Sequence, residues 1–281
     1  MSGSPASDRP HFACPRCRTA APMGENIDQW RCPTCAFQAA RRGGVISFTG
    51  VDVNEWQKFF DDKARGPEGD TILALEYKMS LQNRYIVSAF RKLCSDLKSE
   101  AVILDAGCGN GLFWREFIAP RPVIGIDYSL AMCELAEAKG ITSYQADILK
   151  LPFADDQFDL LYCVEIIQYI EDLHALLAEF ARVCRGRGRV VVSTINRTSI
   201  LQRGLRGIRS LFPRHDMPRS NKYFTRTADD IVGSASDLPL SVNTVAWTHF
   251  PIPWLHRSKS PTRGMDWLAW NVFVEFIKLT A

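Results

Sequence analysis

Short apolar runs alternate along this chain with longer segments in which apolar residues recur at helical spacing. Four such runs follow one another in its middle part and carry a carboxylate at or near their ends, at residues 101–105, 123–127, 144–148 and 158–165. Short aliphatic runs bounded by turn signals are typical of strands buried in a parallel sheet. Because helical segments separate them, the pattern predicts a doubly wound α/β fold that binds its ligand at the carboxyl ends of the strands.

The first run leads directly into a turn with glycines at alternate positions, Gly107, Gly109 and Gly111. Glycine allows a positive φ and lets a ligand approach the backbone without a Cβ in the way. A helix predicted to begin at about Leu112 would point its first amides at the bound group. A dehydrogenase is the alternative for such a turn, but the G-x-G-x-x-G spacing of dehydrogenases is absent here.

Two carboxylates, Asp127 after the second strand and Asp147 in the third, are spaced to bind the ribose and the base of a nucleoside. Asp127 lies 22 positions after Asp105, and an acid about 20 residues beyond a glycine turn suits hydrogen bonding to two vicinal ribose hydroxyls. Asp147 is placed to accept a hydrogen bond from the exocyclic amine of a purine. These residues therefore predict a nucleoside-containing ligand.

The order of these motifs resembles that of class I S-adenosylmethionine-dependent methyltransferases. The matching segments are residues 105–111, Asp127, Asp147, 158–165, and a helix and fifth strand at 178–184 and 189–193. The resemblance covers roughly residues 70–280 and implies a mostly parallel, seven-stranded Rossmann-like sheet, closed by antiparallel strands at 240–248 and 267–279. The sequence departs from the family at 185–188, where Arg-Gly-Arg-Gly replaces the usual Lys-Pro-Gly-Gly.

The resemblance implies an enzyme that uses S-adenosylmethionine as its cofactor. In the family, helices before the sheet cap the cofactor pocket, and here apolar spacing predicts such helices within 70–97. Arg84 on these helices is expected to meet the methionine carboxylate, the alternative being a solvated arginine. The full set of predicted cofactor-binding residues is Asp105, Gly107, Gly109, Asn110, Gly111, Asp127, Tyr128, Asp147, Ile148, Glu165 and Arg84.

Four cysteines near the N-terminus form two C-x-x-C pairs separated by fourteen residues, Cys14, Cys17, Cys32 and Cys35. Four thiolates at this spacing predict a closed tetrahedral zinc site with a structural role, and a segment this small needs the metal to fold. Residues 43–48 resemble the closing strand of Trm112-like zinc ribbons, which precede many small-molecule methyltransferases. A ribosomal RNA guanine methyltransferase family also carries such a ribbon, but its last ligand is a histidine one residue further on, where this chain has Ala36.

We predict three segments along the chain: a zinc ribbon at 1–50, a linker with capping helices at 51–98, and a methyltransferase domain at 99–281. The chain has 281 residues, of which 46% are hydrophobic, enough for a sizeable core. No apolar run approaches the ~18 residues of a membrane span, and residues 1–10 lack the apolar segment of a signal peptide. We therefore expect a cytoplasmic location. The other five cysteines are predicted to be buried thiols: Cys94, Cys108, Cys133, Cys163 and Cys184.

Residues 197–226 hold eight basic residues and one acid, an excess larger than the net charge of +3 for the whole chain. Within them, 199–212 predicts a basic amphipathic helix with Arg203, Arg206 and Arg209 interleaved among apolar residues. The resembled family places a substrate lid here. Three interpretations stay open: peripheral contact with the inner face of the membrane, contact with RNA phosphates, or a lid packed on the domain with its arginines in solvent.

Aromatic residues gather after this segment, which favours an apolar acceptor cavity. We expect transfer of a methyl group to an oxygen, nitrogen or carbon of a hydrophobic or amphipathic small molecule, such as a quinone, polyketide or lipid. The alternative is an rRNA guanine N-methyltransferase whose zinc ribbon recognises RNA. His215 and His249 are the candidate general bases. Some related enzymes bind a divalent metal through Glu-x-x-Glu-His, but Glu165, Gln168 and Tyr169 stand there, so we expect no metal.

Overall fold

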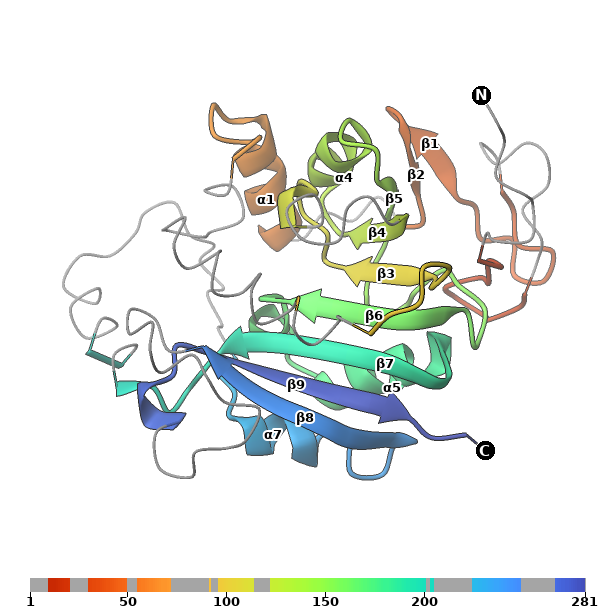
Figure 1. The fold of residues 1–281 in the computed structure, drawn as a ribbon. Coiled ribbons are helices and arrows are strands. Elements are labelled where there is room, and N and C mark those ends of the chain that lie inside the picture. The colour runs from red at the N-terminus through yellow and green to blue at the C-terminus, as the bar shows by residue number, and fades with distance from the viewer. Residues whose placement is uncertain are drawn as a thin grey trace.

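A computed structural model of the chain describes residues 10–20, 30–49, 55–71, 91, 96–113, 122–200, 203–204, 224–248 and 266–280. Among these residues, nine strands form one sheet in the order β1-β2-β5-β4-β3-β6-β7-β9-β8 (Figure 1). The strands are β1 Ala40–Arg42, β2 Val45–Ser47, β3 Ile103–Ala106, β4 Val123–Asp127, β5 Thr142–Gln145, β6 Phe158–Val164, β7 Cys184–Ile195, β8 Leu240–Thr248 and β9 Asn271–Lys278. The helices are α1 Glu55–Arg65, α4 Leu130–Glu137, α5 Leu173–Val183 and α7 Ala228–Gly233, with 3-10 turns η3 Ile167–Tyr169 and η5 Asp266–Leu268.

The predicted doubly wound sheet is confirmed. Strands β5, β4, β3, β6 and β7 pair in parallel, and β9 lies antiparallel between β7 and β8. All four residues of β3 are buried, as expected for a central strand covered on both faces. The carboxyl ends of β3, β4 and β6 therefore meet at one edge of the sheet, where the predicted acids and glycines stand.

Two predicted boundaries move. Strand β9 begins at Asn271, four residues later than position 267, because η5 occupies 266–268 and leaves Trp267 42% exposed. Strand β7 extends from Cys184 through the Arg-Gly-Arg-Gly segment instead of beginning at 189. Within that segment Arg187 takes a φ of +65°, so the chain bends there before β7 pairs regularly with β6 from Arg189 onward.

The cysteine-rich segment is joined to the main sheet, as Figure 1 shows at the edge beyond β5. Strand β2 pairs in parallel with β5 through Ile46 and Ser47, and β1 closes a hairpin on β2. The ring of Phe12 contacts those of Phe48, Tyr144 and Phe153 at centroid distances of 5.6, 5.2 and 5.4 Å. Stacked and edge-on aromatic contacts of this kind stabilise a buried cluster beyond the area it removes from water, so this segment and the sheet share one core.

Part of the predicted lid and capping region lies outside the described residues. This applies to 72–90, which include Arg84, to 201–202 and 205–223, which include His215, and to 249–265, which include His249. In the described part of the chain, no helix has the length and apolarity that crossing a membrane requires.

Candidate active site

A cavity of about 420 Å³ opens at the carboxyl ends of β3, β4 and β6. Eight of the eleven predicted cofactor residues line it, although they come from separate turns of the chain: Asp105, Gly107, Gly109, Asp127, Tyr128, Asp147, Ile148 and Glu165. The topology of a parallel sheet brings these turns together, because the end of each strand faces the same side. The cavity is the place where the predicted site residues converge.

The glycine turn lies tightly against β4. The backbone N–H groups of Gly107 and Cys108 both donate to the carbonyl oxygen of Ile126, at 2.7 and 3.0 Å. Gly107 has a φ of +96°, and a Cβ there would lie 2.4 Å from Cγ1 of Ile166. Only glycine adopts this backbone without strain and without a steric clash, so the turn keeps its backbone open to the cavity.

Asp127 joins the glycine turn to the start of α4. One carboxylate oxygen, Oδ2, accepts from the N–H of Gly109 at 2.9 Å, and Oδ1 accepts from the N–H of Ser129 at 2.8 Å. Burial raises the pKa of Asp127 to about 6, although these backbone donors oppose the shift. Each carboxylate oxygen has a second lone pair, so Asp127 is oriented by the backbone and can still accept two hydrogen bonds from a ligand.

Asp105 lies deeper than Asp127 and is only 2% exposed. The hydroxyl of Tyr162 donates to its Oδ2 at 2.9 Å. Burial raises the pKa of Asp105 to about 8, since desolvation outweighs the bond from Tyr162 and the negative charge of Asp127 adds to the shift. This carboxyl is therefore harder to ionise than an exposed aspartate, and a cation in the cavity would favour its ionised form.

Glu165 follows the last residue of β6 and takes a φ of +59°. A positive φ is uncommon for a residue other than glycine, and such strain clusters at functional sites. The hydroxyl of Ser193 on β7 donates to Oε1 of Glu165 at 3.2 Å. Burial raises the pKa of Glu165 to about 7, with Ser193 opposing. Glu165 lines the cavity, and its carboxyl is held by Ser193 of the neighbouring strand β7.

The other predicted residues that line the cavity follow β4 and β5. Oδ1 of Asp147 accepts from the N–H of Leu149 at 2.9 Å, which orients the carboxylate beside Ile148. The carbonyl oxygen of Tyr128 accepts from Nε2 of Gln145 at 3.1 Å. These bonds hold the turns after the two strands in place, with their side chains on the cavity wall.

Asn110 and Gly111 lie behind the cavity wall. Nδ2 of Asn110 donates to the carbonyl oxygens of Gly69 and Thr71 at 2.8 and 3.0 Å, so the side chain holds the turn after α1. Gly111 has a φ of +75°, and a Cβ there would lie 2.6 Å from Cδ1 of Ile141. In this structure, both residues shape the glycine turn and its surroundings.

Gly111→Ala is expected to lower the free energy of unfolding by about 2–4 kcal/mol, because backbone strain and overpacking add. Gly140→Ala is the matched control, since Gly140 also has a positive φ of +88° but no atom lies within 4 Å of a Cβ there. The control should lose only about 1 kcal/mol, from backbone strain. Urea unfolding of both variants measures the difference. Equal losses would contradict the steric role of Gly111.

Helix α1 supplies cavity residues that the sequence interpretation did not identify. Trp56, Gln57 and Phe60 all face the cavity. The rings of Trp56 and Phe60 contact Tyr169 of η3 at centroid distances of 4.6 and 5.7 Å. The aromatic residues at positions 56, 59 and 60 recur at helical spacing, which was the available signal.

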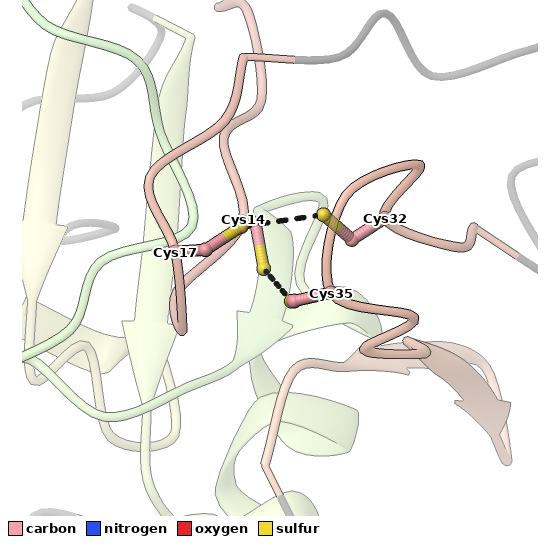
Figure 2. Close-up of side chains that lie close together, drawn as sticks. All are labelled: Cys14, Cys17, Cys32 and Cys35. Carbon is pink, nitrogen blue, oxygen red and sulfur yellow. Dashed lines mark hydrogen bonds between the residues drawn. The ribbon is translucent and has the colours of Figure 1, made fainter.

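The four N-terminal cysteines converge, as Figure 2 shows. Their Sγ atoms all lie within 4.8 Å of one another, and the Cys14–Cys35 and Cys17–Cys32 pairs are each 3.4 Å apart. These separations exceed the ~2.05 Å of a disulfide and approach the ~3.8 Å edge of a tetrahedron with zinc–sulfur bonds of 2.3 Å. Both C-x-x-C turns repeat one geometry, since the residue after each pair, Arg18 or Ala36, has a positive φ.

The sequence matches to known proteins include the central strands of the sheet. Residues 104–192 match a family model described as "Methyltransferase domain". The chain is 37% identical over 109 residues to a malonyl-[acyl-carrier protein] O-methyltransferase from Hamiltonella defensa subsp. Acyrthosiphon pisum (strain 5AT). This match covers 37% of the chain and 41% of that relative, so the chain spans less than half of the relative's length.

Solved structures share the fold at low sequence identity. A chain from the complex between the Haloferax volcanii Trm112 methyltransferase activator and a protein described as a methyltransferase has a TM-score of 0.58 at 17% identity, covering 82% of this chain and all of that one. Geranyl diphosphate C-methyltransferase from Streptomyces coelicolor A3(2) has a TM-score of 0.55 at 15% identity, covering 81% of this chain and all of that one. The sheet therefore has the Rossmann-like fold of methyltransferases.

Proposed function

We propose that this protein is an S-adenosylmethionine-dependent methyltransferase that binds its cofactor in the cavity at the ends of β3, β4 and β6. The observation that carries the proposal is Asp127, whose carboxylate is held by the N–H groups of Gly109 and Ser129 and keeps lone pairs for two ribose hydroxyls. The methyltransferase family match over 104–192 includes these residues and supports the same function.

The cofactor carries an electrophilic methyl group on a sulfonium ion. The residues of this chain would bind and orient it. Asp127 would bind the ribose, Asp147 and Ile148 the adenine, and the backbone of Gly107 and Gly109 would lie under the methionine and the ribose. S-adenosylmethionine bears a net positive charge, and the acidic residues Asp105 and Glu165 both line the cavity. A bound cation would favour the ionised form of both, which makes the acidic wall suited to the cofactor.

The acceptor is proposed to be a hydrophobic or amphipathic small molecule. Besides the acids proposed to bind the cofactor, the cavity is lined by four aromatic residues, Trp56, Phe60, Phe113 and Tyr169. One similar protein is named for O-methylation of malonyl-[acyl-carrier protein] and another for C-methylation of geranyl diphosphate; geranyl diphosphate is an amphipathic small molecule of the proposed class. With acceptor and cofactor held in contact, an in-line displacement depends mainly on positioning. His215 and His249 remain the proposed general bases.

The test is calorimetric titration with S-adenosylmethionine, followed by incubation of the protein with cell extract and a methyl-labelled cofactor. We expect binding of one equivalent and label in a low-molecular-mass lipophilic product. Label in RNA would favour the alternative, an rRNA methyltransferase, and should then be accompanied by RNA affinity that falls steeply with salt. Absence of cofactor binding would overturn the proposed function.

The four cysteines are proposed to hold a structural zinc ion in a Trm112-like ribbon. Four sulfur atoms with tetrahedral spacing fit zinc and complete its coordination without water. Arg18, directly after the first pair, forms an ion pair with Glu179 of α5 at 2.6 Å, and Glu179 Oε1 also accepts from the N–H of Leu151. The ribbon is thus tied to the same domain that holds the cavity.

The basic segment at 199–212 is proposed to make peripheral contact with anionic lipid on the inner face of the membrane. The sequence there combines apolar residues with Arg203, Arg206 and Arg209. Flotation with anionic liposomes, comparing wild type with a variant in which these three arginines become glutamates, should show loss of binding in the variant. Equal flotation of both proteins would remove the membrane interpretation and leave contact with RNA or a lid packed on the domain.

Cofactor affinity is expected to fall at acid pH, because a protonated Asp127 cannot accept from both ribose hydroxyls. With a pKa of about 6 for Asp127, S-adenosylhomocysteine should bind about tenfold more weakly at pH 5 than at pH 8. Asp127→Asn should remove the part of this dependence that is centred near pH 6, whereas the parts due to Glu165 and Asp105, whose pKa values are about 7 and 8, should stay. Calorimetry in buffers of equal ionic strength measures it, and an affinity that stays constant from pH 8 to pH 5 would contradict the assignment.

A further inference from the structure

Asp61 lies on the buried face of α1 and is only 8% exposed. Its Oδ1 accepts from Oγ of Ser129 at 2.5 Å and from the N–H of Ala131 at 3.1 Å. A buried carboxylate is costly unless hydrogen bonds compensate for its lost hydration. Here the compensation comes from the first turn of α4, where the helix dipole also favours a negative charge. Asp61 therefore attaches one helix to the end of another, 68 positions away in the chain.

Ser129 connects this attachment to the proposed cofactor site. It is the N-cap of α4, and its Oγ accepts from the N–H of Met132 at 3.1 Å. Its own N–H donates to Oδ1 of Asp127 at 2.8 Å. One residue thus bonds both to the carboxylate proposed to bind ribose and to the carboxylate on α1. A displacement of α1 would therefore shift Ser129 and, with it, the carboxylate of Asp127.

The opposite wall of the cavity is attached to α1 as well. Trp56 and Phe60 pack on Tyr169 of η3, and both line the cavity. Beyond the C-terminal end of α1, Asn110 of the glycine turn binds the carbonyl oxygens of Gly69 and Thr71. The segment 55–71 is therefore held by three turns that surround the cavity: those after β3, β4 and β6.

We propose that Asp61 is a positioning residue that latches α1 over the cavity, so that cofactor affinity depends on its bond to Ser129. This inference rests on the proposed function. Since Asp61 does not line the cavity, it acts through Ser129 and through the placement of Trp56 and Phe60. An apolar cluster that includes Ala64, Ala131 and Met132 also joins α1 to α4, so the fold should survive loss of the latch.

The test compares the affinity for S-adenosylmethionine of five variants by calorimetry. Asp61→Ala should bind about tenfold more weakly than wild type, since a hydrogen bond to a charged group contributes on that scale. Asp61→Asn keeps an acceptor oxygen and should recover most of the loss. Asp62→Ala alters an exposed neighbour on the same helix and should bind as wild type does. Ser129→Ala, alone and combined with Asp61→Ala, completes a double-mutant cycle in which the two losses should not add.

Two outcomes would overturn the inference. The first is unchanged affinity in Asp61→Ala, whether or not the melting temperature of the protein without cofactor falls, and the second is losses that add in the double variant. If Asp61→Ala does not fold, Ser129→Ala still tests the inference, because it removes the donor of the same hydrogen bond, and wild-type affinity in that variant would overturn it. Failure of the wild-type protein to bind S-adenosylmethionine would instead overturn the proposed function, on which the latch depends.

Discussion

Asp127→Ala is expected to weaken S-adenosylmethionine binding by at least about 100-fold. Two hydroxyl bonds to a charged acceptor would be lost, at about 1.5–3 kcal/mol each. The substitution also releases the N–H groups of Gly109 and Ser129, which the carboxylate holds at 2.9 and 2.8 Å. The glycine turn and the start of α4 would then lose their common anchor. Calorimetry at pH 8 measures the affinity.

Two comparisons make this prediction specific to Asp127. Asp127→Asn keeps the shape and one carbonyl acceptor, and its loss should be intermediate. Asp155→Ala removes an exposed carboxylate that pairs with Arg182, neither residue being part of the cavity lining, and it should leave the affinity unchanged. Wild-type affinity in Asp127→Ala would remove the observation on which the proposed function depends.

Loss of the proposed zinc ion is expected to destabilise the whole protein. Wild type should contain one zinc per chain, and Cys32→Ser should contain almost none, because a three-sulfur site is incomplete. The free energy of unfolding should fall by several kcal/mol and the melting temperature by about 10 °C. The physical reason is the shared core: β2 extends the main sheet beside β5, and Phe12 packs on Tyr144 and Phe153.

The control for the metal site is Cys184→Ala, which removes a buried thiol outside the cluster. It should retain full zinc and lose only about 1 kcal/mol from a small cavity. Elemental analysis and calorimetric melting measure both quantities. If Cys32→Ser lost its zinc but melted as wild type does, the ribbon would be an independent unit and its contacts with the sheet would contribute little to stability.

The structure confirms the predicted sheet most closely where the evidence was local. The apolar runs that became β3, β4 and β6 differ from their surroundings over four to seven residues, and strand β8 matches its predicted bounds of 240 and 248. The strand at 267–279 was predicted to begin too early, because its apolar pattern continues through Trp267 into η5. The apolar pattern alone does not show at which residue a strand begins to pair. Here pairing with β8 begins at Asn271, and the N–H of Trp270, one residue earlier, donates to the carbonyl oxygen of Thr248 at 2.6 Å.

Side-chain direction was harder to predict than position in the chain. Asn110 lies in the glycine turn and was predicted to contact the cofactor. Its side-chain amide instead donates hydrogen bonds to the carbonyl oxygens of Gly69 and Thr71. Helix α1 was not singled out although its aromatic spacing was visible, because a short amphipathic segment in a linker has no local feature that marks it as a cavity wall.

The sequence by itself determined which residues stand at the carboxyl ends of the strands, since hydrophobic periodicity, glycine and short-range spacing are properties of neighbouring positions. It therefore determined the sheet, the acids Asp105, Asp127 and Glu165, and the four-cysteine cluster. Only the tertiary structure decided which distant groups meet: Asp61 with Ser129, Phe12 with Tyr144, and Trp56 with Tyr169. Those contacts depend on how separate elements pack, and packing depends on the shape and volume of the whole core.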